Sequence, residues 1–471
     1  MLRHRLLRRL PPLVAVALAT SLLAAPATAA RYDGGLSTPR EDSYYPQHGD
    51  PGIDVLHYGL VLRWHRGTRT LLGEALIWIR PTADADSFKL DLGPTMKVTR
   101  VEVDDARVAF HHSGTVLTID HPVVTNQRFP VAISYRGTPH PIPAPTTRSD
   151  EPNVGMSVTK DGQLRTMQEP FGALTWYPAN DQPSDKARYD IRVRAPKGWI
   201  GVSNGRLTEI DTTRARTITS FKLDHPVATY LTTLAVGPYV HRTATGPRGL
   251  PLNYWLPKGH PDKYLDVLKH LPSDLRWLEQ RLGPYPFESA GVVVVPGDSA
   301  METQTLVTFG KKTWADPQQA REVMVHELAH QWYGDTVTPS DWSDLWLNEG
   351  MAMYLEARWS TEHTPLAWRD WVRYFRSANQ SERAEQGGPG AYDKTMFATN
   401  CVYLCTSAMY EALRKRIGDD AFWALVRRWP QGRPDTNVDR VGFIALTERI
   451  SGQDLGMFFD DWLNSPTWPP R

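Results

Sequence analysis

The chain contains the pentapeptide HELAH at residues 326–330, and a further acidic residue, Glu349, follows nineteen residues later. On an α-helix, residues four apart differ by about 400° of rotation, so the two imidazoles project from nearly the same face. Two neutral imidazoles and one carboxylate leave the fourth position of a tetrahedral zinc open to water. Glu327 lies between the histidines and can reach that water as a general base. We therefore expect one zinc ion per chain, bound by His326, His330 and Glu349.

The residues around the pentapeptide favour a buried helix that ends at Gly334. A second helix can begin after Ser340 or Asp341 and carry Glu349 back to the metal. Glu356 lies two helical turns beyond Glu349, on the same face, and can accept a hydrogen bond from a ligand imidazole. The alternatives are an amphipathic helix whose histidines share a face by chance, and a solvated glutamate at 356.

The run HELAHQWYGDTVTPSDWSDLWLNEGMAMYLE, residues 326–356, resembles the zinc site of the aminopeptidase N-like metallopeptidases, a family that includes the leukotriene hydrolase-type enzymes. Eighteen residues lie between His330 and Glu349, which is the family's spacing. The resemblance covers nearly the whole chain after its leader. It implies an α+β protein of two domains, with an antiparallel β-sheet or sandwich domain followed by a thermolysin-like, mainly helical zinc domain.

Length and hydrophobic patterning agree with two domains. A chain of 471 residues is too long for one ordinary core. Residues 58–137 alternate with a period of two, as β-strands do, whereas helical periodicity dominates after residue 264. Composition changes near residues 243–249, so we expect a β-rich domain at 55–243, preceded by a segment at 31–54, and a catalytic domain at 244–471.

The formal net charge of +1 gives no reason to expect nucleic acid or an anionic membrane as a partner. Residues 1–30 have an arginine-rich start, an apolar stretch and a small-residue cleavage site, which together indicate a signal peptide. We expect cleavage near Ala29 or Ala30 and export of a soluble protein, with a signal anchor as the alternative. Export by the general or the twin-arginine route stays open.

Glu302 lies in the run SAMET, residues 299–303, which resembles the family motif Gly-Ala-Met-Glu-Asn. The resemblance implies that Glu302 binds the free α-ammonium group of a substrate and that Ala300 and Met301 contact the substrate. A fixed carboxylate opposite a buried cation offsets the cost of taking that cation out of water. Serine and threonine replace the usual glycine and asparagine at the ends of the motif.

The resemblance implies a second amine-binding carboxylate from the β-rich domain, at Glu169 in the run TMQEP. Relatives often carry glutamine two residues before this glutamate. Met167 occupies that position here, and the neighbouring Gln168 is the remaining candidate for contact with the substrate backbone.

A hydroxyl group is needed to stabilise the oxyanion, and two tyrosines on one predicted helix, Tyr403 and Tyr410, are candidates. The family's spacing favours Tyr403, which leaves Tyr410 as a packing residue. Cys401 and Cys405 flank Tyr403 and are the only cysteines in the chain. Four residues apart on an α-helix, their side chains could approach bonding distance, but their Cβ vectors are poorly aimed for a bridge. Two unbonded, buried side chains are therefore favoured, and a bond between them stays open.

The resemblance implies a zinc aminopeptidase that hydrolyses the first peptide bond of peptides with a free N-terminus. The alternatives are a zinc endopeptidase and a catalytically weak or non-catalytic peptide-binding member of the same family. Hydrolysis of a non-peptide substrate is less favoured, because the leukotriene branch relies partly on a C-terminal domain that we expect to be absent. The sequence predicts no preferred first side chain, since pocket walls come from scattered loops.

Overall fold

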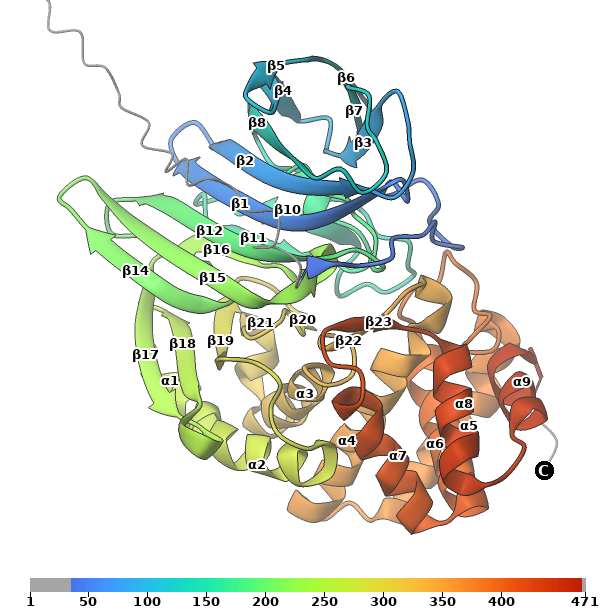
Figure 1. Cartoon of the computed structure of the whole chain (residues 1–471). Helices are drawn as coiled ribbons and strands as arrows, with labels where there is room; N and C mark the ends of the chain where they lie inside the picture. The colour runs from blue at the N-terminus through green and yellow to red at the C-terminus, as the bar shows by residue number, and fades with distance from the viewer. Residues whose placement is uncertain (1–34, 468–471) are drawn as a thin grey trace, which may run out of the picture.

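The computed structural model describes residues 35–467, so the expected signal peptide lies outside the described part of the chain. A β-rich domain packs over a mainly helical domain, as expected (Figure 1). Within residues 35–467, no helix combines the length and the apolar character needed to cross a membrane.

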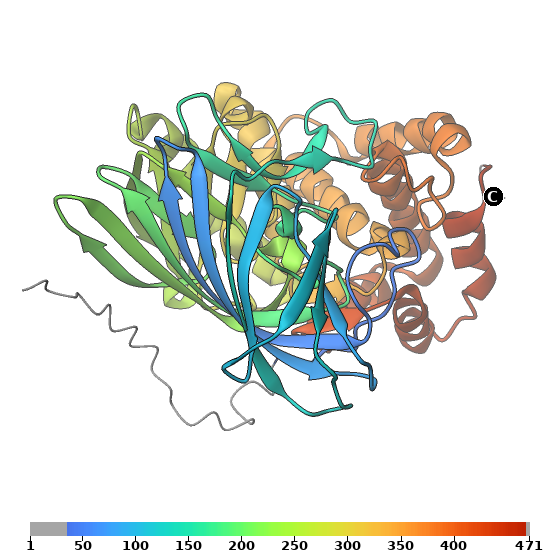
Figure 2. The ribbon, with the colours of Figure 1, turned by 90° about the horizontal axis from the view of Figure 1, so that it is seen from above.

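The largest sheet of the β-rich domain has eight strands, of which only β1 and β12 pair in parallel. The order is β14 (Arg206–Thr212), β15 (Arg216–Ala228), β12 (Lys186–Pro196), β1 (Ile53–His65), β2 (Thr70–Pro81), β8 (Phe129–Gly137), β4 (Met96–Val103) and β5 (Ala106–Arg107). Leu60, Leu62 and Trp64 of β1 are buried and their neighbours Val61 and Arg63 are exposed, which is the predicted period of two. Figure 2 shows the long strands side by side.

Two smaller sheets complete the β-rich domain. One contains β3 (Phe88–Asp91), β7 (Val116–Asp120) and β6 (Ala109–Ser113). The other contains β13 (Ile200–Ser203), β16 (Leu234–Gly237), β11 (Leu164–Met167), β10 (Asn153–Val158) and β9 (Ile142–Pro143). Strand β11 ends immediately before Gln168 and Glu169, so the end of a central strand fixes the position of the expected amine-binding carboxylate.

The helical domain begins with a sheet of its own, in the order β17 (Tyr239–Thr245), β18 (Pro251–Pro257), β19 (Ala290–Val295), β21 (Val307–Gly310) and β20 (Ala300–Met301). Strand β17 pairs with β18 along its whole length. The expected boundary at 243–244 therefore falls inside a strand. The change in composition at 243–249 marks the turn of this hairpin rather than a linker between domains.

Two helices of this domain lie between β18 and β19, and the others follow β21. The helices are α1 (Asp262–Leu268), α2 (Leu271–Leu282), α3 (Pro317–His330), α4 (Trp346–His363), α5 (Trp368–Gln386), the π-helical turn η7 (Cys401–Cys405), α6 (Thr406–Ile417), α7 (Asp419–Gln431), α8 (Arg440–Ser451) and α9 (Gly456–Asn464). Helix α1 ends at Leu268, and α2 begins at Leu271 with Pro272 in its first turn, where the N–H that proline lacks would have no partner within the helix. Helix α3 starts at Asp316, whose side chain caps the N–H groups of Gln318 and Gln319.

A chain of four buried threonine hydroxyls crosses the seam between the domains. Thr166 of β11 contacts Thr233, Thr233 contacts Thr308 of β21, and Thr308 contacts Thr303, each over 2.9 Å. Thr303 is the residue that replaces the asparagine of the family motif. The chain of hydroxyls therefore ties the strand leading to Glu169 to the segment that carries Glu302.

We expect Thr233→Val to lower the free energy of unfolding by about 1–3 kcal/mol, because it leaves the buried hydroxyls of Thr166 and Thr308 without a shared partner. Urea denaturation followed by fluorescence measures this change. Thr208→Val is the matched control, since Thr208 is exposed and its hydroxyl bonds a strand carbonyl away from the seam. Equal effects of the two substitutions would contradict a role for the threonine chain at the seam.

Candidate active site

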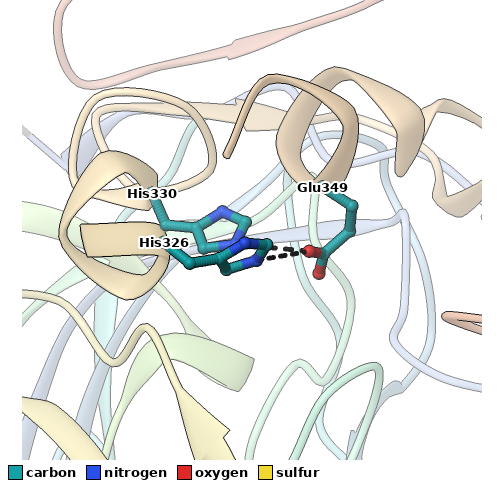
Figure 3. A group of neighbouring side chains, drawn as sticks. All are labelled: His326, His330 and Glu349. Carbon is teal, nitrogen blue, oxygen red and sulfur yellow. Dashed lines mark hydrogen bonds and ion pairs between the residues drawn. The ribbon is translucent and has the colours of Figure 1, made fainter. Parts of the chain in front are cut away.

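Three side chains from two helices converge as the sequence predicts. His326 and His330 project from α3 and Glu349 from α4, and all three are buried (Figure 3). The carboxylate oxygen Oε2 of Glu349 lies 3.2 Å from Nε2 of His326 and 3.3 Å from Nε2 of His330. Zinc bonds of 2.0–2.1 Å in a tetrahedron place neighbouring donor atoms about 3.3 Å apart. The donor atoms therefore have the separation that one zinc ion requires.

Hydrogen bonds to the other ring nitrogens fix the direction of both imidazoles. Nδ1 of His330 lies 3.0 Å from the carbonyl oxygen of Tyr333, which can only accept, so this nitrogen carries the hydrogen. Nδ1 of His326 lies 3.0 Å from Oε2 of Glu356, the contact expected for that glutamate. In the neutral rings, Nε2 then directs a lone pair at the Glu349 carboxylate. A cation between them removes the repulsion between these acceptors.

The ionisation of Glu349 also favours a bound cation. Burial opposes its negative charge, but when His330 and His326 are protonated they hold the pKa of this carboxyl well below its ordinary value. With neutral rings, a metal dication supplies the positive charge in their place. Burial raises the pKa of Glu327 to about 8, against the opposing effect of His326 and His330. A metal dication bound by the neighbouring ligands would lower the pKa of Glu327. It would thus favour the ionised carboxylate, which is the form that a general base needs.

A cavity of about 1020 Å³ lies at the seam between the domains and contains these residues. Its walls come from both domains, including Glu169 from the β-rich domain and Glu302, Glu327 and Tyr403 from the helical domain. Such a volume accommodates a small peptide. The structure therefore brings all the expected catalytic, amine-binding and metal-binding side chains to one cavity.

The carboxyl groups of Glu169 and Glu302 lie close to each other and to the metal ligand Glu349. One oxygen from each lies within 4.8 Å of the others and of a Glu349 oxygen. Within the described residues, Oε1 of Glu169 and Oε1 of Glu302 are buried and have no hydrogen-bond partner. Burial, followed by the charge of Glu302, raises the pKa of Glu169, and burial also raises that of Glu302. Buried carboxyl oxygens without a hydrogen-bond partner are stabilised when a cation binds opposite them.

Gln331, which the sequence analysis did not single out, connects Glu302 to the zinc helix. Its Nε2 donates to the carbonyl oxygen of Glu302 over 2.9 Å, and its Oε1 accepts from the N–H of Thr305 over 2.8 Å. Gln331 follows His330 directly. The position of an amide side chain directly after the pentapeptide was the only hint of this role in the sequence. The role itself depends on Glu302, which lies 29 residues earlier in the chain.

The side chain of Gln168 does not face the substrate cavity as a free polar group, which differs from the expectation. Its Nε2 donates to the carbonyl oxygens of Thr229 and Thr232, and its Oε1 accepts from Trp176. These bonds use the amide to hold the β-rich domain together, because the alternation along the strand points this residue inward.

Ala300 and Met301 form β20, which lies at the edge of its sheet and pairs with β21 on one side only. Both residues line the cavity. An edge strand offers unpaired backbone N–H and C=O groups to an extended chain. The placement agrees with the contact to substrate that the family motif implied.

Tyr403 lines the cavity, and the centre of its ring lies 6.0 Å from that of His326. Its hydroxyl oxygen accepts a hydrogen bond from Nη1 of Arg148 over 3.2 Å, a contact between residues 255 positions apart. Tyr410 is fully buried and packs against Trp346 and Phe443. It is the packing residue that the family's spacing indicated.

Cys401 and Cys405 form a disulfide, which corrects the expectation of two unbonded cysteines. The expectation assumed an α-helix, in which Cα atoms four residues apart are separated by about 6 Å. These residues instead span the π-helical turn η7, and their Cα atoms are 4.7 Å apart. Wider turns of this kind bring such positions closer and are frequent at functional sites.

The chain matches both domains of one peptidase family. Residues 56–231 match the Peptidase M1 N-terminal domain, and residues 268–462 match the Peptidase family M1 domain. Aminopeptidase N of Streptomyces lividans is 25% identical over 335 residues, which cover 65% of this chain and 38% of that protein. Aminopeptidase N of Lactococcus lactis subsp. cremoris is 29% identical over 338 residues, which cover 65% of this chain and 39% of that protein. The chain thus matches about two fifths of the length of these curated relatives.

Two solved structures match this chain over nearly the whole length of the solved chains. An M1 zinc metallopeptidase from Deinococcus radiodurans superposes with a TM-score of 0.82 at 26% identity, covering 91% of this chain and 97% of that chain. A variant of that enzyme, described as bound to a Tyr-Ser-Ala substrate, superposes with a TM-score of 0.79. The match covers 91% of this chain and 98% of that chain. The two-domain arrangement is therefore shared over the full length of a solved relative.

We expect purified wild-type protein to hold one zinc ion per chain and Glu349→Ala to lose it, because the carboxylate completes the donor set. Glu356→Gln should weaken zinc affinity by about 10–100-fold, since the ring of His326 loses its orienting partner. Mass spectrometry of dialysed samples and competition with a chromophoric chelator measure both effects. Glu385→Gln, on the exposed face of α5, is the control. Full zinc content in Glu349→Ala would contradict the assigned ligand set.

Proposed function

We propose that this chain, which belongs to the peptidase M1 family of zinc metallopeptidases, is an aminopeptidase that hydrolyses the N-terminal peptide bond of peptides. One observation carries the proposal: two buried carboxyl groups with unpaired oxygens, those of Glu169 and Glu302, lie beside the metal ligands. The relatives called aminopeptidase N, and the structural relative described with a tripeptide substrate, support the same activity.

The two carboxyl groups explain why the first peptide bond is cleaved. A substrate's α-ammonium placed between Glu169 and Glu302 gains the partner charge that it needs on leaving water. Their oxygens lie within 4.8 Å of the metal ligand Glu349. The distance from the ammonium to the reacting carbonyl is then about one residue, so bonds further along the peptide do not reach the metal.

The substrate backbone is held at the edge strand β20. Ala300 and Met301 present backbone groups that are not used by β21 on that side. An extended peptide can pair with them, which keeps the first carbonyl in register with Glu302 at the end of the strand. Orientation of this kind lowers the barrier by fixing the reacting atoms before the chemical step.

Protein groups then perform the proton transfers. A zinc ion bound by His326, His330 and Glu349 supplies Lewis acidity and lowers the pKa of a water molecule at the site. Glu327 takes the proton of the attacking water and delivers it to the leaving amine. The Tyr403 hydroxyl donates a hydrogen bond to the carbonyl oxygen as negative charge develops there, a contribution of about 3 kcal/mol to the barrier.

We also propose that the protein is exported. The arginine-rich start, apolar stretch and small-residue site within residues 1–30 support this proposal. The disulfide between Cys401 and Cys405 agrees with an oxidising compartment.

We expect wild-type protein to hydrolyse aminoacyl-p-nitroanilides, to lose this activity with a chelator and to regain it with zinc. Glu327→Gln should lower kcat by about 10²–10⁴-fold at unchanged zinc content, because the proton carrier is removed. A panel of first residues identifies the preferred side chain. The proposal fails if zinc-loaded wild-type protein cleaves no substrate of the panel, and cleavage of N-blocked peptides alone would indicate an endopeptidase.

Glu302→Gln should lower kcat/KM for substrates with a free amine by about 30-fold or more, because a buried ammonium loses its partner charge. The same substitution should reduce the preference for free over N-acetylated substrates. Parallel assays of the two substrate forms measure the ratio. Glu74→Gln, at an exposed position of β2, is the control. An unchanged ratio would rule out amine binding by Glu302.

Expression in an exporting host should yield extracytoplasmic protein whose N-terminus follows Ala29 or Ala30. Mass spectrometry of the intact protein and its N-terminal peptide locates the cleavage site. Recovery of the full-length chain from the membrane fraction would instead support the signal anchor.

A further inference from the structure

The loop between β9 and β10 is anchored to the helical domain. Its residues 144–152 belong to no helix or strand. In the structure, the carbonyl oxygen of Pro145 accepts from the N–H of Phe397 over 2.9 Å, and the Thr146 hydroxyl donates to the carbonyl oxygen of Phe397 over 2.6 Å. These bonds bring the next residues of the loop to the wall of the active-site cavity.

Arg148 extends from this anchored loop to Tyr403. Its Nη1 lies 3.2 Å from the Tyr403 hydroxyl oxygen and 3.5 Å from the carbonyl oxygen of Ala398. Its Nε and Nη2 lie 3.1 Å and 2.6 Å from the two carboxylate oxygens of Asp150. One guanidinium therefore connects the loop, the segment before η7 and the tyrosine.

The number of N–H groups decides what Arg148 can do. A guanidinium has five N–H groups. Asp150 accepts from two of them, and the carbonyl oxygen of Ala398 and the hydroxyl of Tyr403 accept from one each. A substrate carboxylate bound side-on requires two parallel N–H groups, and only one remains. The hydrogen bond from Arg148 holds the pKa of Asp150 below its ordinary value, so the cation already has an ionised partner. The arrangement suits positioning of a protein group better than binding of a substrate anion.

The contact with Arg148 determines the direction of the Tyr403 hydrogen. A phenol has one hydrogen to donate and accepts through its oxygen lone pairs. When the oxygen accepts from a cationic N–H, the phenol hydrogen turns away from Arg148 and is free to point into the cavity. The adjacent positive charge also polarises the O–H bond and strengthens it as a donor.

We propose that Arg148 is a positioning residue that acts through Tyr403, holding its hydroxyl oxygen so that the hydroxyl hydrogen donates to the substrate carbonyl oxygen. This inference rests on the proposed function, in which Tyr403 stabilises the developing oxyanion. It assigns a role in catalysis to a loop of the β-rich domain, 255 residues away from the tyrosine that it orients.

A double-mutant cycle tests the proposal. Arg148→Met and Arg148→Gln should each lower kcat by about tenfold or more with little change in KM, because an oriented donor is lost from the transition state. In the Tyr403→Phe background, the same substitutions should lower kcat by less than about twofold. Arg206→Met is the matched control, since Arg206 pairs with Asp224 at an exposed position of the β-rich domain. Melting temperature and zinc content are measured for every variant.

Two kinetic outcomes would overturn the proposal. An equal loss of kcat in the wild-type and Tyr403→Phe backgrounds would show that Arg148 does not act through Tyr403. A rise in KM with unchanged kcat would show that Arg148 contacts the substrate instead.

A second measurement does not depend on activity. In zinc-loaded protein labelled with ¹³C at tyrosine Cζ, the Tyr403 signal is identified by its absence in Tyr403→Phe. Arg148→Met should shift this signal, and Arg206→Met should leave it in place. An unshifted signal in Arg148→Met overturns the proposal even if the wild-type protein proves inactive as an aminopeptidase, so the two failures are distinguishable.

Discussion

Accumulated negative charge in a buried space is the constraint on which the rest of the site depends. Glu169, Glu302, Glu327 and Glu349 line one cavity, and unpaired oxygens remain on two of them. Removing carboxylates from water costs several kcal/mol each unless positive charge is placed opposite them. A metal dication held by Glu349 and the two neutral histidines would offset part of this charge, and under the proposed function a substrate ammonium would offset the rest. The same imbalance thus favours metal binding and supports the proposed selection of an amine.

The two domains are held together by the groups that also position this charge. The threonine chain connects the strand before Glu169 to the segment of Glu302, and Gln331 connects that segment to the zinc helix. Arg148 adds a third connection, from the β-rich domain to Tyr403. Because each link is a short hydrogen bond between buried or half-buried groups, sliding of one domain over the other would displace both the amine site and the oxyanion donor. The site requires a rigid seam.

The sequence predicted what depends on local periodicity and failed where partners are distant. The pentapeptide and its helix follow from residues four apart, and the position of Glu349 follows from a resemblance in spacing. The disulfide was missed because a π-helical turn has no signature in the residues that form it. The inward role of Gln168 and the contact of Arg148 depend on partners 61 and 255 residues away, which no local pattern encodes. The expected boundary near residue 243 lies inside β17, because the hairpin turn that follows this strand has the composition of a linker.

The shortness of β20 has a consequence for which peptides are accepted. A strand of two residues offers backbone pairing to only the first few atoms of a bound chain, whatever side chains follow. Most of the recognition energy then comes from the charged end of the peptide, which every unblocked chain possesses. Under the proposed function, chemical blocking of that end should therefore protect a peptide more than any substitution beyond its first few residues. The proposed site therefore selects peptides by a free amino terminus and rejects those whose amino terminus is blocked.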